Sequence, residues 1–132
     1  VNIIVSSIQF LASDHKYEKW ANFPYAKKRM FDILRAQPDK KCLFLSGDRH
    51  IAEISKRDLR GLNYPLYDIT SSGLTHSYEE SREYNSHRLG QLITRRNYGF
   101  LELDWTDAGL FLQITLYSTS GKTLEKLALG KF

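Results

Sequence analysis

The chain has 132 residues, the size of one domain or of part of one, and its formal net charge is +4. Its 42% apolar and 13% aromatic residues can fill a packed core, which excludes a disordered, collagen-like or coiled-coil chain. The excess of 19 Lys and Arg over 15 Asp and Glu is mild, so it suits an anionic substrate without indicating a nucleic-acid scaffold.

Charges interrupt every apolar run, and no run approaches the roughly 18 residues of a membrane-spanning helix. We therefore expect no membrane span in this segment. The single cysteine, Cys42, can form no internal disulfide. The chain begins at Val1 directly in an apolar run, and we expect it to be a piece of a longer polypeptide.

A strand followed by a helix is predicted at the start of the chain. Residues 2–5 are mostly β-branched and continuous, which predicts a strand buried on both faces. A helix is predicted to run to about Ala36, with Asn22 as its cap and Pro24 in its first turn. Its predicted buried face carries Ala26, Met30, Ile33 and Leu34. Its predicted solvent face carries Lys27, Lys28, Arg29 and Arg35.

A second continuous apolar run over residues 42–46 predicts a second buried strand. Strand, helix and strand of these lengths form a parallel βαβ unit. Parallel strands bring their carboxyl ends to one edge of the sheet, where open α/β sheets bind ligands. We therefore expect Ser6, Ser7 and Gln9 to lie beside residues 47–50 (Gly-Asp-Arg-His).

The rest of the chain has mainly strand patterns. The predicted strands are 51–57, 65–70, 98–105, 110–118 and 123–129. The third and fourth of these flank a Thr-Asp-Ala-Gly turn and are predicted to pair as a hairpin. The polar segment 77–97 is predicted to be a long loop with room for one helical turn, long enough to suspect a function.

The turn after the second predicted strand has the strongest potential for chemistry. The Asp48 carboxylate and the His50 imidazole, two residues apart, can reach neighbouring positions on a metal, and Gly47 gives the turn its backbone freedom. The alternative is a purely structural turn, closed by the Asp48 side chain, with His50 bonded to backbone. The spacing alone leaves both interpretations open.

Other polar residues are weaker candidates. His15, His76 and His87 could each bind phosphate or transfer a proton, or could lie in solvated loops, and Arg88 follows the last of them. The sequence has no nucleophile elbow, dinucleotide fingerprint or phosphate-binding loop, which removes the usual hydrolase and nucleotide-binding hypotheses. A metal-type site is the hypothesis that remains.

Several motifs occur in a recognisable order: Ser6–Gln9, Glu18–Pro24, Leu45–Glu53 and Tyr67–His76, extended by Asn85, Arg88 and Asn97–Gly99. Together they resemble the carboxyl-terminal half of PhoD-like alkaline phosphatases and phosphodiesterases, which are calcineurin-like metallophosphoesterases. The resemblance covers residues 3 to about 105. Several ordered motifs are more specific than Gly-Asp-x-His alone.

The resemblance implies an α/β fold in which residues 1–132 are the carboxyl-terminal part of one metallophosphoesterase domain. This part would be half of a two-sheet sandwich, a βαβ unit followed by antiparallel hairpin strands that complete its sheet. Asp48 and His50 would ligate a dinuclear metal site, of iron with calcium or of zinc or manganese, with His50 at the iron-type position. Arg49, His76 and Arg88 are assigned to binding of a phosphate ester substrate.

The same resemblance implies that this chain holds only part of the site. The family's other ligands and its catalytic Asn-His lie in the amino-terminal half, and a Gly-His motif of the wider superfamily would fall near Ser7 and Gln9, where this sequence has no His. We therefore expect the chain to be inactive without the amino-terminal half of the same protein. Periplasmic or extracellular localisation is implied by resemblance only. The competing hypothesis is a non-catalytic α/β structural or interaction module, and metal content would discriminate the two.

Overall fold

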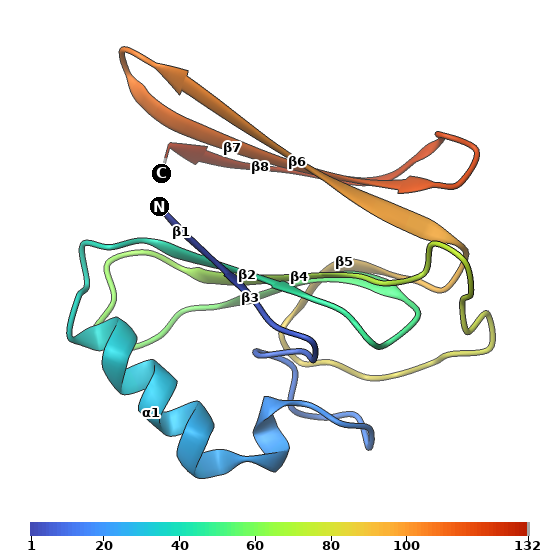
Figure 1. Ribbon diagram of the computed structural model, residues 1–132, viewed down its shortest axis with the longest axis horizontal. Helices are drawn as coiled ribbons and strands as arrows, with labels where there is room; N and C mark the ends of the chain where they lie inside the picture. Colours follow the sequence, from blue (N-terminus) through green and yellow to red (C-terminus); the bar gives the residue numbers. More distant parts are fainter. Residues whose placement is uncertain (132) are drawn as a thin grey trace.

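The computed structural model describes residues 1–131, which form two β-sheets and a long helix (Figure 1). The elements are β1 (Asn2–Val5), the 3-10 helix η1 (Trp20–Asn22), α1 (Pro24–Arg35), β2 (Cys42–Ser46), β3 (Ala52–Arg57), β4 (Leu66–Ser71), β5 (Arg88–Ile93), β6 (Asn97–Thr106), β7 (Gly109–Ser118) and β8 (Thr123–Lys131). Within this described part, no helix has the length and apolar character that crossing a membrane requires.

The first sheet is mixed and has the strand order β1-β2-β4-β3-β5. β2 runs parallel to both β1 and β4, so the predicted parallel pairing of the first two strands is confirmed. β3 is antiparallel to both of its neighbours. The carboxyl ends of β1, β2 and β4 therefore lie at one edge of the sheet, and the loops that follow them start there.

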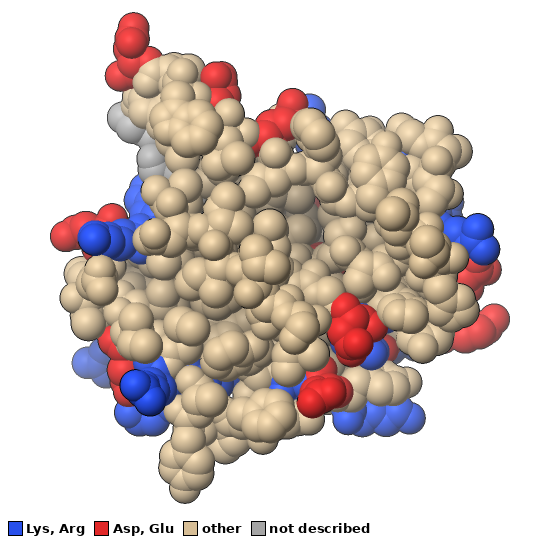
Figure 2. Space-filling view, in the orientation of Figure 1, with Lys and Arg blue, Asp and Glu red and all other residues tan. Residues whose placement is uncertain are grey.

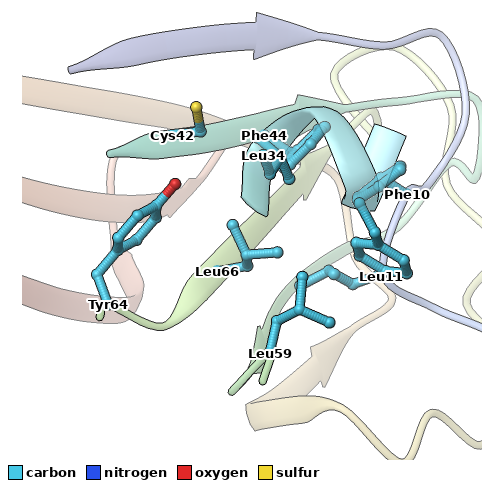
Figure 3. Packing of buried hydrophobic residues seen from close by; sticks show 9 residues of the cluster. Phe10, Leu11, Leu34, Cys42, Phe44, Leu59, Tyr64 and Leu66 are labelled. Atoms are coloured by element: carbon cyan, nitrogen blue, oxygen red, sulfur yellow. The ribbon is translucent and has the colours of Figure 1, made fainter. Parts of the chain in front are cut away.

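Helix α1 covers one face of this sheet (Figure 1). The core between them gathers Phe10, Phe31, Leu34, Phe44 and Leu66, all buried, and Figure 3 shows most of these residues converging there. The rings of Phe10 and Phe44 stack with centroids 4.0 Å apart. Because Phe10 lies in the loop that follows β1, this stack anchors that loop on the sheet.

The other face of the first sheet packs against a second sheet of order β6-β7-β8 (Figure 1). The predicted hairpin and last strand are confirmed, but the expectation that these strands complete the first sheet is wrong. The side chains of β7 alternate between its two faces, and Leu112, Ile114 and Leu116 are buried on one of them. A strand with one apolar face buries that face against another layer, and here the layer is the first sheet, which contributes Ile54 and Ile69 to the shared core.

The prediction that residues 2–5 are buried on both faces is wrong, because β1 is an edge strand. Ile4 packs against the helix-side core, whereas Val5 is 77% exposed and Ile3 is also exposed. Alternate side chains of a strand point to opposite faces, so Ile3 and Val5 present an apolar row on the other side of the sheet.

Pro24 lies in the first turn of helix α1 as predicted, but Asn22 does not cap the helix. Phe23 is the N-cap residue and forms no side-chain capping bond. The Asn22 side chain instead accepts a hydrogen bond from Lys19 Nζ at 2.8 Å. Asn22 ends the preceding 3-10 helix, which shifts the start of α1 by one residue.

The predicted buried face of α1 is only partly correct. Leu34 is buried and Met30 is partly buried, but Ala26 and Ile33 are exposed. The residues that face the sheet are Lys27, Phe31 and Leu34, at spacings of four and three. The large Phe31 ring points at the sheet, and with the helix in this orientation Lys27, which was predicted to be solvent-exposed, is buried.

The segment 77–97 is not a continuous loop, since residues 88–93 form β5. β5 pairs with β3 through a bulge opposite Ala52 and Ile54. β5 is an outer strand that contains Gly90 at a φ of 78°. It has no continuous β-branched run that would predict a strand. The loop between β4 and β5 therefore spans residues 72–87.

Lys27 is expected to destabilise the protein at neutral pH. Burial, with a smaller contribution from nearby Arg57, lowers the pKa of its ammonium from 10.5 to about 8. Between these two pKa values the unfolded chain binds more protons than the folded one, so the free energy of unfolding should rise with pH by up to about 3 kcal/mol.

Lys27→Met should raise the free energy of unfolding at pH 7 by roughly 1–2 kcal/mol, since it removes a buried charge but also the bond from Nζ to the Leu11 carbonyl. Urea unfolding of both proteins at pH 7 and pH 10 measures this. If both proteins show the same increase between the two pH values, Lys27 is not the group responsible.

Candidate active site

The turn after β2 holds two non-glycine residues in left-handed backbone conformation, Asp48 with φ 68° and His50 with φ 51°. Such conformations are costly for residues with a β-carbon and concentrate at functional sites. The turn is fixed by a hydrogen bond from the His50 amide to Ser72 Oγ at 2.9 Å. A β-carbon added at Gly47 would lie 3.6 Å from the Ser7 carbonyl, so the end of β1 adjoins this turn as predicted.

Asp48 and His50 both line one groove of about 820 Å³. Its walls come from the loop after β1, the turn after β2 and the loop between β4 and β5. The lining residues are His15, Lys16, Tyr17, Asp48, Arg49, His50, Tyr78, Glu80, Ser81, Arg82 and Glu83. The groove thus lies at the sheet edge where the carboxyl ends of the parallel strands meet.

The His50 ring is held by two other rings. It stacks on Tyr78 with centroids 5.0 Å apart and planes 15° apart, and His76 meets it edge-on at 5.2 Å. The Tyr78 amide also donates to the His50 carbonyl at 3.2 Å. His50 Nδ1 is buried and has no hydrogen-bond partner within the described residues. His76 is therefore brought next to His50, although it is not among the residues that line the groove.

Arg49 is 4% exposed, and its Nη2 donates to the Glu83 carboxylate. Its guanidinium carbon lies 4.0 Å above the Tyr17 ring. Arg49 Nε is buried without a partner in the described structure. The arginine between the two candidate ligands is thus an anchored cation in the wall of the groove.

Arg88 is not among the residues that line the groove. Its Nε donates to Glu53 Oε2 at 2.5 Å, and its Nη2 donates to the Glu83 carbonyl at 2.7 Å. The structure therefore gives Arg88 two protein partners, and its assignment to substrate binding stays a prediction.

A buried polar network connects through Arg88 to Glu83 of the groove. Glu53 is 2% exposed and accepts hydrogen bonds from Gln9 Nε2 at 2.6 Å and Asn85 Nδ2 at 2.9 Å, in addition to Arg88. Gln9 Nε2 also donates to Thr70 Oγ1 at 2.8 Å. Three segments far apart in the sequence meet at this one carboxylate.

Asp68, in the middle of β4, is the second buried carboxylate. It accepts hydrogen bonds from the Phe10 and Leu11 amides at 2.7 and 2.9 Å and from Ser46 Oγ at 2.7 Å. Burial raises the pKa of Asp68, and these hydrogen bonds oppose that shift. The residue ties the loop after β1 to the sheet. The sequence signal was available, since Asp68 interrupts an apolar strand.

His15 is buried, so the interpretation of this histidine as part of a solvated loop is wrong. Burial, together with the positive charges of Arg49 and Lys19, lowers its pKa from 6.5 to about 4. Both ring nitrogens lack a hydrogen-bond partner within the described residues. At neutral pH His15 is therefore an uncharged imidazole at the groove.

The donors present fit two positions of a metal site. Asp48 offers carboxylate oxygen and His50 offers imidazole nitrogen, a donor pair that suits iron, zinc, manganese or, through the carboxylate, calcium. No group of three or more His, Cys, Asp and Glu residues in the described part of the chain could hold a metal ion. A dinuclear site would therefore need donors from outside these residues.

This fold is similar to that of a solved structure of PhoD, with a TM-score of 0.56 and 12% sequence identity. The similarity covers 99% of this chain and 32% of the PhoD chain, so the chain spans about a third of that protein. No protein-family model matches the sequence, and a comparison with curated proteins finds no match. The predicted α/β class and a PhoD-like fold are thus supported by structure, while the roles of the site residues stay predictions.

Proposed function

We propose that the polypeptide containing this chain is a metal-dependent phosphate-ester hydrolase of the PhoD-like kind. The observation that carries the proposal is the turn after β2, which places Asp48 and His50 together on one groove, each in left-handed conformation. The motif resemblance and the PhoD-like fold support the same function.

In this proposal Asp48 and His50 are ligands to a dinuclear centre of iron with calcium, or of zinc or manganese. When bound, two such ions supply an activated hydroxide and neutralise the phosphoryl oxygens. His50 would use Nε2, since its Nδ1 is buried. The stacked Tyr78 ring would hold the imidazole plane toward the groove.

The remaining ligands are proposed to come from the amino-terminal half of the same protein. Apolar surface beside β1 supports a partner of this kind, since Ile3, Val5 and Phe100 are exposed. An apolar recess of about 330 Å³ between the sheets is lined by residues including Leu45 and Leu74. Figure 2 shows a broad face with few charged side chains at its centre. Export to the periplasm or the cell exterior is proposed from resemblance alone.

The test compares the intact polypeptide with the 132-residue chain. Each is stripped with EDTA, supplied with iron, calcium, zinc or manganese, and assayed with para-nitrophenyl phosphate and its bis-ester. We expect metal-dependent turnover by the intact polypeptide only, because two ligands leave most coordination positions to water.

Two results would contradict the proposal. If the isolated chain shows metal-dependent turnover above that of its His50→Ala variant, a complete site lies within these residues. If the intact polypeptide takes up no metal, the non-catalytic module is the better hypothesis.

A further inference from the structure

We propose that the Glu83 carboxylate occupies, in the free protein, the place on Arg49 that an anionic oxygen of a phosphate ester takes when it binds. Glu83 would thus be a built-in competitor that phosphate must displace. The inference deepens the proposed function, because it concerns how the same groove receives its substrate.

The hydrogen bonds of Arg49 are incomplete. Its Nη2 donates to Glu83, while its Nε is buried without a partner among the described residues. A guanidinium binds phosphate most favourably through two parallel N–H groups. A phosphoryl group in place of the Glu83 carboxylate could accept from both nitrogens.

The position of Arg49 also favours this role. The residue lies between the candidate ligands Asp48 and His50 in the sequence, and its side chain lines the same groove. Contact with the Tyr17 ring at 4.0 Å orients the guanidinium, so little side-chain freedom is left to lose on binding.

Glu83 can release Arg49 without movement of its backbone. Its carbonyl accepts a hydrogen bond from Arg88 Nη2 at 2.7 Å, and Arg88 is itself held by Glu53. The loop is therefore anchored at Glu83, whereas the carboxylate is on a flexible stem. Rotation of that side chain is sufficient to exchange one anion for another.

Two further residues of the groove lack polar partners. Ser81 Oγ and both ring nitrogens of His15 are buried and unpaired in the described structure. Buried polar atoms in native proteins almost always have a partner, which can be a ligand or a water. An oxyanion with several lone pairs would suit donors from Arg49, Ser81 and neutral His15.

The test measures binding of inorganic phosphate to the intact polypeptide in EDTA, by calorimetry and by the phosphate-induced shift in melting temperature. Glu83→Gln should bind phosphate about tenfold more tightly than the wild type, because the competing charge is gone and Arg49 is left without its anion. Glu80→Gln is the matched control. Glu80 lines the same groove, is exposed and has no ion pair among the described residues.

Glu80→Gln should change phosphate affinity by less than about twofold, since the Glu80 carboxylate is exposed to solvent and, within the described structure, does not pair with Arg49. Adding Arg49→Met to Glu83→Gln should abolish the gain. If Glu83→Gln does not fold, Glu83→Asp, which keeps the charge but shortens its reach to Arg49, should still bind phosphate more tightly than wild type.

Equal affinities of wild type and the Glu83 variant, or an equal gain in Glu80→Gln, would overturn the inference. The measurement needs neither metal nor hydrolysis. If Glu83→Gln binds phosphate more tightly but the intact polypeptide shows no metal-dependent turnover, this inference holds and the hydrolase proposal fails. If the intact polypeptide shows metal-dependent turnover but Glu83→Gln does not bind phosphate more tightly, the hydrolase proposal holds and this inference fails.

Discussion

Replacing His50 by alanine in the intact polypeptide is expected to reduce hydrolysis of para-nitrophenyl phosphate by roughly a thousandfold, which corresponds to about 4 kcal/mol of transition-state stabilisation. The physical reason is the loss of a proposed metal ligand. Asp48→Asn should have an effect of similar direction, because it removes the ligand charge. Steady-state kinetics and metal content measure the result.

The fold should tolerate both changes. Asp48 is exposed and His50 is only partly buried, so the packing lost is confined to the contacts of the His50 ring with Tyr78 and His76. Asn is also among the residues that accept a φ of 68° most readily, which makes Asp48→Asn a conservative backbone replacement. For the same reason His50→Asn is a second variant that removes the imidazole while it suits the left-handed conformation.

The control is Asp107→Asn, an exposed change in the turn between β6 and β7. It should leave both turnover and melting temperature unchanged. Wild-type turnover in the His50 and Asp48 variants would reject their role as ligands. A large fall in melting temperature would instead assign the loss of activity to unfolding.

The regular part of the fold was predictable because its signals are local. β2 is an apolar run buried on both faces, and β7 alternates, so each pattern identifies its strand. β5 was missed because an outer strand with a glycine carries no such pattern. The burial of Lys27 could not be predicted either, since the orientation of a helix depends on which large side chain the sheet accommodates.

The site was predictable only where its residues are close in sequence. Asp48 and His50 belong to one turn, and parallel pairing placed that turn at the sheet edge. The contacts of Arg49 with Glu83 and of His50 with Tyr78 join segments about 30 residues apart, and no local pattern reports them. Asp68 did leave a signal, because a carboxylate between Tyr67 and Ile69 in a buried strand needs buried hydrogen-bond donors.

Asp68→Ala is expected to lower the free energy of unfolding by roughly 3–6 kcal/mol, a large part of the stability of a domain of this size. The carboxylate is 1% exposed and accepts three hydrogen bonds. Its removal leaves the Phe10 and Leu11 amides and the Ser46 hydroxyl buried with a lost partner, although Ser46 also contacts Thr70 at 2.9 Å. Urea unfolding followed by circular dichroism measures the change.

Asp68→Asn removes the negative charge but can keep the hydrogen bonds, so it distinguishes their contributions to stability. The amide oxygen can still accept from the Phe10 and Leu11 amides, and the Ser46 hydroxyl can turn to accept from the new NH2 group while it donates to Thr70. The asparagine variant also avoids burying a charge, so it should lose less than about 1.5 kcal/mol. Because the two amides lie in the loop that carries His15, the alanine variant should also increase amide exchange over residues 10–19, whereas β6 to β8 keep their protection. A loss below 1 kcal/mol in Asp68→Ala, or equal losses in both variants, would show that these hydrogen bonds do not hold the loop to the sheet.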